Sequence, residues 1–322
     1  MIPIRDTIPS RNYPVANNAL ILINICIFFF QMIQGASLGQ FVYTYGLTPA
    51  KFFHPLISHH ISMEEKLFSF VSYMFLHGGF LHLIANMWSL YIFGDNVEDR
   101  LGPIRYIGFY LLSGIGAGFF HLFLNANSNI PTIGASGAIA GVMGAYFILY
   151  PGSKILTLIP IVIIPWFVEI PAFFFLGLWF LMQFINAAGS DALNSGVAWW
   201  AHIGGFIWGM LLLHVFPRIP ESGFTETIRS MTAKKNSPKL QIIHASGVGD
   251  DPNLYGTLVI SSYEALSGTA KLVNIPWGLY RRLYRIIIPP GVTNGKILRL
   301  KGMGRAIAGK ATGDLMLRIL IS

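Results

Sequence analysis

Six long apolar runs constrain this chain more than any other feature of its sequence. They span residues 19–33, 75–93, 104–124, 133–150, 170–187 and 197–216. Each run, with its flanks, is about long enough to cross a hydrocarbon layer of roughly 30 Å. Charged residues make up only 11% of the chain, whereas a soluble domain needs about a quarter. The sequence therefore predicts a mainly α membrane protein, a bundle of six transmembrane helices.

The basic residues between the runs indicate how the bundle is oriented. Arg100, Arg105, Lys154 and Arg218 lie in loops on one side, which the positive-inside rule makes cytoplasmic. Both ends of the chain then lie in the cytoplasm, and residues 1–16 lack the cleavage site of a signal peptide. We expect a multi-pass protein of a bacterial cytoplasmic membrane.

One apolar stretch does not fit the six spans. Residues 156–166 are apolar, but Pro160 and Pro165 interrupt them. We interpret this stretch as an interfacial or re-entrant lead into the fifth span. The polar segment 35–66 is predicted to be an ordered outer loop without a regular period.

Composition excludes several classes of protein. The single cysteine, Cys26, excludes a disulfide framework and a cysteine-based zinc site. His54, His59 and His60 do not have the spacing of a known metal site, so we expect no metal there. The net charge of +8 comes mostly from residues beyond Arg218, and beside a membrane such charge reports orientation rather than nucleic-acid binding.

Four polar side chains fall near the outer ends of the second, fourth and sixth runs. They are His82, Asn86, Ser136 and His202, all predicted to lie about 5–10 Å below the outer surface. His82 and Asn86 are four residues apart and project from one helix face. Polar groups are costly against lipid, so these four should face one another inside the bundle.

Ser136 follows Gly134 and opens a helix, where backbone N–H groups are free to bind an anion. His202 is a candidate base for the serine hydroxyl, and the Asn86 amide is a candidate donor to an oxyanion. No carboxylate is predicted to lie at the depth of these side chains, because Asp95, Glu98, Glu169 and Asp191 fall near the inner ends of runs or in the last outer loop. The pattern predicts a Ser-His dyad whose histidine is oriented by packing and helix contacts rather than by a carboxylate.

Each of these residues also has a structural interpretation. Ser136 can be one small residue of a tight helix interface, His202 can bond a backbone carbonyl, and Asn86 can form an interhelical hydrogen bond. A transporter site would instead require ionisable residues along a path through the bilayer. Close approach of the fourth and sixth runs would bring Ser136 to His202, and two small-xxx-small pairs favour it: Gly137 with Gly141, and Gly205 with Gly209.

Taken together, these motifs resemble the rhomboid intramembrane serine proteases. The matching pieces occur in the family's order: His82-Leu83-Ile84-Ala85-Asn86, then Gly94 with Glu98 and Gly102, then Gly134-Ala135-Ser136-Gly137, then Ala201-His202-Ile203-Gly204-Gly205 with Gly209. The resemblance covers about residues 15–217. It implies a six-helix core that cleaves single-span membrane proteins without a cofactor, with Ser136 as nucleophile, His202 as base, His82 and Asn86 at the oxyanion, and Glu98 in a structural role.

Two positions depart from this family pattern. The family often carries an aromatic residue one turn after the serine, but this chain has Ala140. Many members have a Trp-Arg pair in the first outer loop, whereas no tryptophan precedes Trp88 here. Both departures concern support of the histidine and the loop rather than the dyad. A catalytically silent rhomboid-like adaptor that binds membrane clients for quality control is the alternative function, although such relatives typically lack the serine or the histidine.

The chain changes character beyond residue 217. Residues 218–239 are interpreted as a linker, and 240–322 as a small cytoplasmic all-β sandwich. The β-like runs are 240–244, 257–261, 285–288, 296–300 and 315–321.

This region resembles the C-terminal client-binding domain of DnaJ-type co-chaperones. The matching fragments are Glu264-Ala265-Leu266-Ser267-Gly268, Ile288-Pro289-Pro290-Gly291-Val292 with Gly295-Lys296, Arg299-Leu300-Lys301-Gly302-Met303-Gly304 and Gly313-Asp314-Leu315. The resemblance implies a sandwich that holds an extended polypeptide, a substrate tail or partner protein. A stabilising or dimerising appendage is the alternative.

Overall fold

The computed structural model of the chain divides into two compact units, Met1–Thr232 and Ala233–Ser322. It describes residues 1–161, 164–189, 198–220, 223–234, 240–247, 249–277, 280–306 and 311–322. Asp191 and two parts of the predicted linker, residues 221–222 and 235–239, lie outside the described residues. Part of that linker differs from expectation, because helix α11 (Gly223–Thr232) lies within it. Arg229 of α11 donates to the backbone carbonyl of Asp99 at 3.0 Å, which joins this helix to the first unit.

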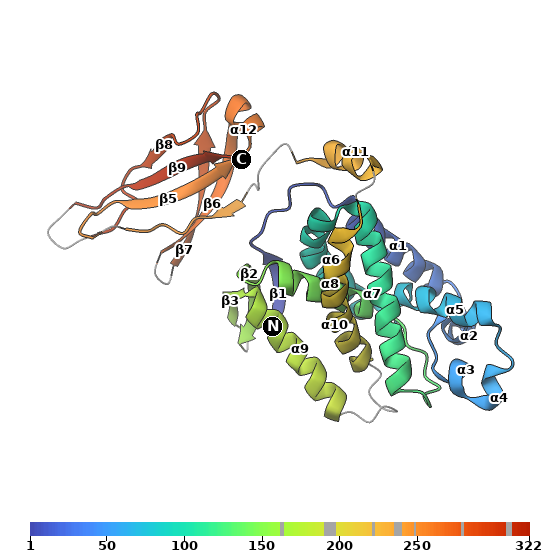
Figure 1. The fold of residues 1–322 in the computed structure, drawn as a ribbon. Helices are drawn as coiled ribbons and strands as arrows, with labels where there is room; N and C mark the ends of the chain where they lie inside the picture. The colour runs from blue at the N-terminus through green and yellow to red at the C-terminus, as the bar shows by residue number, and fades with distance from the viewer. Residues whose placement is uncertain are drawn as a thin grey trace. The chain divides into compact units, whose positions relative to one another are not determined.

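Each of the six apolar runs coincides with a helix of the first unit (Figure 1). These helices are α1 (Val15–Met32), α6 (Phe80–Leu101), α7 (Pro103–Leu124), α8 (Ser136–Leu149), α9 (Ala172–Gly189) and α10 (Trp199–Val215). By length and composition, α1, α7 and α9 are long and apolar enough to cross a membrane, and α5 (Met63–Ser72) with α6 forms a pair bent by 82°. Helices α8 and α10 are shorter apolar helices. The number of six crossings therefore stays a prediction.

Helix α8 lies at the centre of the bundle and is buried from Gly137 to Tyr146. It packs against α6, α7 and α10. Its approach to α10 is close because glycines face backbone: a Cβ on Gly205 would lie 2.1 Å from the carbonyl oxygen of Gly137. A Cβ on Gly209 would lie 2.2 Å from the carbonyl oxygen of Gly141. The two helices therefore touch along their backbones, as small residues at a helix interface permit.

The segment predicted to be an interfacial or re-entrant lead into the fifth span is a β-hairpin. Strands β2 (Lys154–Ile161) and β3 (Ile164–Pro171) pair antiparallel, and β1 (Ile2–Asp6) adds to β2, which makes a three-stranded sheet. Pro160 pairs with Pro165 next to the hairpin tip, where few ladder hydrogen bonds are needed. The prolines thus terminate a strand pair rather than interrupting a helix. Residues Ile2–Asp6 of the N-terminal segment, for which the sequence predicted no strand, form the third strand.

The segment between α1 and α6, predicted to be an ordered loop, is a series of short helices. They are the 3₁₀ helix η1 (Gly35–Ser37), α2 (Leu38–Tyr45), α3 (Ala50–Phe53), α4 (Pro55–Ser58), α5, and the 3₁₀ helix η2 (Tyr73–Phe75). Lys51 holds this segment together by donating from Nζ to the carbonyls of Tyr43 at 2.6 Å and Thr44 at 2.9 Å.

Carboxylates at the end of α6 remote from His82 bind the N-terminal segment. Glu98 accepts the backbone N–H groups of Ala16 at 3.1 Å and Asn17 at 2.8 Å, so it satisfies the free donors at the start of α1. The resemblance implied a structural role for this residue, and these contacts describe one.

Asp6 of β1 sits in a polar cluster with α6 and α8. Its Oδ2 accepts from Asn96 Nδ2 at 2.7 Å and from the Tyr146 hydroxyl at 2.6 Å. Burial raises the pKa of the Asp6 carboxyl to about 7, and the charge of Asp95 acts in the same direction. The Tyr146 hydrogen bond opposes that rise without cancelling it.

The second unit contains two three-stranded sheets, in the orders β4-β6-β7 and β5-β9-β8. The strands are β4 (Leu240–Ile242), β5 (Leu254–Ile260), β6 (Thr269–Trp277), β7 (Tyr280–Ile288), β8 (Ile297–Leu300) and β9 (Leu315–Ile321). Residues of both sheets form one apolar core, so this unit is a β-sandwich. The sequence prediction included every strand except β6.

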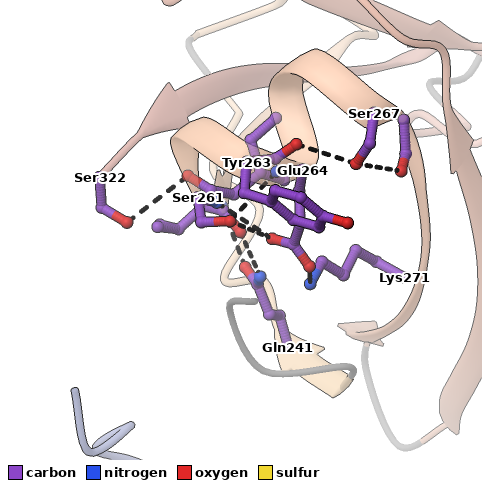
Figure 2. Close-up of polar contacts among 10 residues, drawn as sticks. Gln241, Ser261, Tyr263, Glu264, Ser267, Lys271 and Ser322 are labelled. Carbon is purple, nitrogen blue, oxygen red and sulfur yellow. Dashed lines mark hydrogen bonds and ion pairs between the residues drawn. The ribbon is translucent and has the colours of Figure 1, made fainter. Parts of the chain in front are cut away.

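A buried polar cluster anchors helix α12 (Ser262–Ser267) of this unit (Figure 2). Ser261 and Glu264 form a reciprocal capping box, and Lys271 pairs with the Glu264 carboxylate. The side chains of Lys271 and Glu264 are 1% and 3% exposed. An ion pair so deeply buried depends on both partners being present.

Candidate active site

Ser136 and His202 come together although they are far apart in the chain. Ser136 is the first residue of α8, and its Oγ lies 2.8 Å from Nε2 of His202 in the first turn of α10. The backbone contact between these two helices places the residues side by side. A serine at hydrogen-bond distance from an imidazole is the arrangement that nucleophilic catalysis requires.

The other nitrogen of the same imidazole is occupied as well. Nδ1 of His202 lies 2.9 Å from Oε1 of Gln183 on α9. Gln183 Nε2 in turn donates to the backbone carbonyl of Trp179 at 3.0 Å. Sequence reasoning missed Gln183. The signal that marks it is an amide side chain inside an apolar span, which is costly unless it has a partner.

Two tryptophans flank the His202 imidazole, although position 140 of this chain carries alanine and not the aromatic residue of the family pattern. The Trp179 ring of α9 lies 6.0 Å from the His202 ring at an interplanar angle of 32°, and the Trp199 ring lies 6.0 Å away at 89°. Ala140 itself is fully buried in α8. Aromatic contact with the histidine thus comes from α9 and α10 rather than from α8.

His82 lies beside the serine. Gly134 has φ +129°, and a Cβ there would lie 2.9 Å from His82 Nε2 and 3.6 Å from Ser136 Oγ. Glycine at this position therefore leaves the space between the two side chains open. His82 Nδ1 accepts the backbone N–H of Gly78 at 3.3 Å, which leaves Nε2 as the protonated nitrogen and a donor toward that space.

Asn86 is buried one turn further along α6, on the face that carries His82. Its Nδ2 has no hydrogen-bond partner among the described residues. A buried amide without a partner costs free energy, so this donor is available to a ligand. Neither Ser136 nor His202 is hydrogen-bonded to Asn86 in the described part of the chain.

His77 is a second residue that sequence reasoning missed. It is fully buried, and neither ring nitrogen has a partner among the residues that the structure describes. Its ring lies 5.2 Å from that of His82, and its backbone is bonded on both sides by Gln31. Over the described ranges, no group of three or more His, Cys, Asp or Glu side chains is placed to hold a metal ion.

Several known proteins are similar to this chain. Residues 64–218 match the rhomboid domain model. The chain is 29% identical to RHOMBOID-like protein 5 of Arabidopsis thaliana over 50% of its own length and 48% of that protein. It is 32% identical to the mitochondrial Rhomboid protein 1 of Saccharomyces cerevisiae over 44% of its length and 40% of that protein. With the rhomboid protease AarA of Providencia stuartii it shares 28% identity over 62% of its length and 72% of that protein.

The fold and these matches define an integral membrane protein of apolar helices. Within its helical unit, residues 64–218 match the rhomboid domain model, and one of these relatives, AarA, is named a rhomboid protease. The chain spans about half the length of the Arabidopsis relative and less than half of the yeast one.

Proposed function

We propose that the protein is an intramembrane serine endopeptidase with Ser136 as nucleophile and His202 as general base. The observation that carries the proposal is the 2.8 Å contact between Ser136 Oγ and His202 Nε2 inside an apolar helical bundle. A serine that served only to let helices approach would not need an imidazole aimed at its hydroxyl. The accompanying Gln183 contact gives the imidazole a defined orientation.

The reaction follows from the positions of the donors and acceptors. Ser136 Oγ attacks the scissile carbonyl while its proton passes to His202 Nε2, and the carbonyl oxygen becomes an oxyanion. His82 Nε2–H, Asn86 Nδ2 and the free N–H groups at the start of α8 are the donors proposed to hold this oxyanion. The imidazolium then protonates the leaving amine, which leaves an acyl-enzyme. Water hydrolyses the acyl-enzyme by the same steps, with His202 again as base.

The proposed substrates are single-span membrane proteins, cleaved in the outer half of the bilayer. Ser136 opens α8 instead of standing within it, so a substrate backbone must approach from outside that helix end. A transmembrane helix has its amides satisfied internally and must unwind locally to present a carbonyl. Both termini are proposed to be cytoplasmic, in a bacterial cytoplasmic membrane.

Labelling of the detergent-purified protein with a fluorophosphonate probe tests the nucleophile. The wild type is expected to label covalently, Ser136→Ala not at all, and His202→Ala at least about 100-fold more slowly. Ser153→Ala is the matched control, because this serine is also mostly buried but bonds Tyr146. Labelling that survives Ser136→Ala would reject this serine as nucleophile. A folded wild type that neither labels nor cleaves any membrane protein would favour the silent adaptor.

For the second unit we propose binding of an extended polypeptide, a substrate tail or a partner protein. The outer face of the β6–β7 pair carries Leu272, Leu283 and Ile287, which are 39%, 59% and 74% exposed. Strand β7 is at the edge of its sheet, where an extended chain can add by backbone hydrogen bonds. Leu283→Asp with Ile287→Asp is expected to reduce cleavage of substrates with long cytoplasmic tails and to spare tailless ones. Equal cleavage of both substrate sets by this variant would support the alternative of a stabilising appendage.

A further inference from the structure

We infer that Gln183 is the positioning residue of the site, the third member of a hydrogen-bonded triad with Ser136 and His202. The inference rests on the proposed function and adds to it the group that holds the histidine ready to accept the serine proton. Gln183 occupies, on α9, the place that a carboxylate takes in serine hydrolases with three such residues.

The hydrogen bonds of Gln183 fix which end of its amide faces the histidine. Nε2 donates to the carbonyl oxygen of Trp179, one turn earlier on α9. A carbonyl oxygen only accepts, so the NH₂ group must face Trp179 and Oε1 must face His202. The 2.9 Å contact between Oε1 and His202 Nδ1 then requires a proton on Nδ1.

This assignment determines the chemistry at the other nitrogen. A neutral imidazole carries one proton, so protonation at Nδ1 leaves a lone pair on Nε2. That lone pair faces Ser136 Oγ at 2.8 Å. Without Gln183 the ring can hold its proton on Nε2, or turn about its side-chain torsions, and in either case it accepts no proton from the serine.

An amide suits this place better than a carboxylate does. Gln183 is 6% exposed, and a charged group buried to this extent is costly unless it is fully paired. The amide oxygen supplies an acceptor without that charge. It also interacts favourably with the imidazolium that forms when the serine is deprotonated, because its dipole is already oriented by Trp179.

Three variants test the role. Gln183→Met keeps the length and approximate volume of the side chain but removes the acceptor. Gln183→Glu, as the neutral acid, restores an oxygen facing His202 and keeps a donor for the Trp179 carbonyl. Asn24→Leu is the control, because Asn24 is another fully buried amide that bonds a backbone carbonyl one turn away. Turnover of a membrane substrate and the tautomer of ¹⁵N-labelled histidine are measured, with activity normalised to folded protein.

We expect Gln183→Met to lower kcat by about 10- to 100-fold with KM changed less than about twofold, because the acceptor and not the substrate site is lost. Gln183→Glu should recover most of that loss, and Asn24→Leu should keep the wild-type kcat. A Gln183→Met variant with wild-type kcat would overturn the role while Ser136-dependent cleavage still stood. If the wild type shows no such cleavage, the proposed function fails. The tautomer of His202 then tests the positioning role separately. A proton on Nδ1 in the wild type that is absent in Gln183→Met supports this role, and the same tautomer in both proteins rejects it.

Discussion

Gly209 of α10 lies directly against Gly141 of α8, so closely that a Cβ on Gly209 would stand 2.2 Å from the Gly141 carbonyl oxygen. The seam continues one turn nearer the site, where a Cβ on Gly205 would stand 2.1 Å from the Gly137 carbonyl oxygen. Ser136 precedes this seam on one helix and His202 precedes it on the other. The distance between the two reacting groups is therefore set by glycines that carry no reactive atom.

Substitution in this seam should damage both stability and catalysis. In Gly205→Ala the new methyl meets backbone rather than a flexible side chain, so α10 must move away from α8. We expect a loss of about 1–3 kcal/mol in unfolding free energy and at least a tenfold fall in kcat, measured by thermal unfolding and substrate cleavage. Gly177→Ala on α9 is the control, since a Cβ there meets nothing within 4 Å. Full activity of Gly205→Ala would show that the seam does not set the dyad distance.

Asn86 offers a variant that separates catalysis from stability. Its buried Nδ2 has no partner in the described part of the chain, so Asn86→Leu removes an unsatisfied polar group and should leave the unfolding temperature unchanged or higher. If the amide binds the oxyanion, kcat should fall about 100- to 1000-fold. Steady-state cleavage and thermal unfolding are measured on the same preparation. A parallel fall of activity and stability would instead indicate a structural amide.

The Asp6 carboxyl should contribute to the pH dependence of the unfolding free energy. The folded-state pKa of this carboxyl is raised to about 7 from 3.8, so the folded protein binds more protons than the unfolded chain between these values. The contribution of Asp6 to the unfolding free energy should therefore fall as pH rises from about 4 to about 7, by at most about 1.4 kcal/mol per pH unit, and level off above. Asp6→Asn should remove this contribution, measured as the difference between the wild-type and variant unfolding free energies at each pH. An unchanged slope in that variant would assign the dependence to another group.

The buried Lys271–Glu264 ion pair of the second unit predicts that a single and a double variant will differ in stability. Lys271→Met leaves the Glu264 carboxylate buried without its cation and should destabilise this unit by about 3–5 kcal/mol. Lys271→Met combined with Glu264→Gln should regain much of that loss, because the capping box with Ser261 keeps its acceptor. Calorimetry and amide exchange of the β-strands measure both. Equal stability of the single and double variants would mean that burial of the carboxylate is not the cause.

The long apolar runs located the helices well, because length and hydropathy alone decide which segments are stable in a membrane. The sequence pattern placed all six helices and most strands of the second unit. It failed at residues 156–166, where an apolar run with prolines fits a re-entrant segment as well as a hairpin. The pairing partner β1 decides between them, and it lies about 150 residues away in the sequence, beyond what a local pattern reports.

The candidate site was predictable to the extent that unusual polar residues appear at matching depth. Ser136, His202, His82 and Asn86 were found in this way, and the structure places the first three around one space. Gln183 was missed because its amide neither attacks a substrate nor exchanges a proton, whereas histidine, serine and carboxylates do. An amide acts here through the orientation of its dipole, which only its neighbours Trp179 and His202 define.

Helix α8 has 14 residues and is therefore only about 21 Å long, some two-thirds of a hydrocarbon layer. With its far end level with the headgroups, its first residue stands well beneath the opposite surface. We expect the missing turns to leave room for solvent above Ser136. On the proposed function, water would then reach the depth at which a membrane-spanning substrate carries its peptide bonds, because one helix is short, without need of a channel.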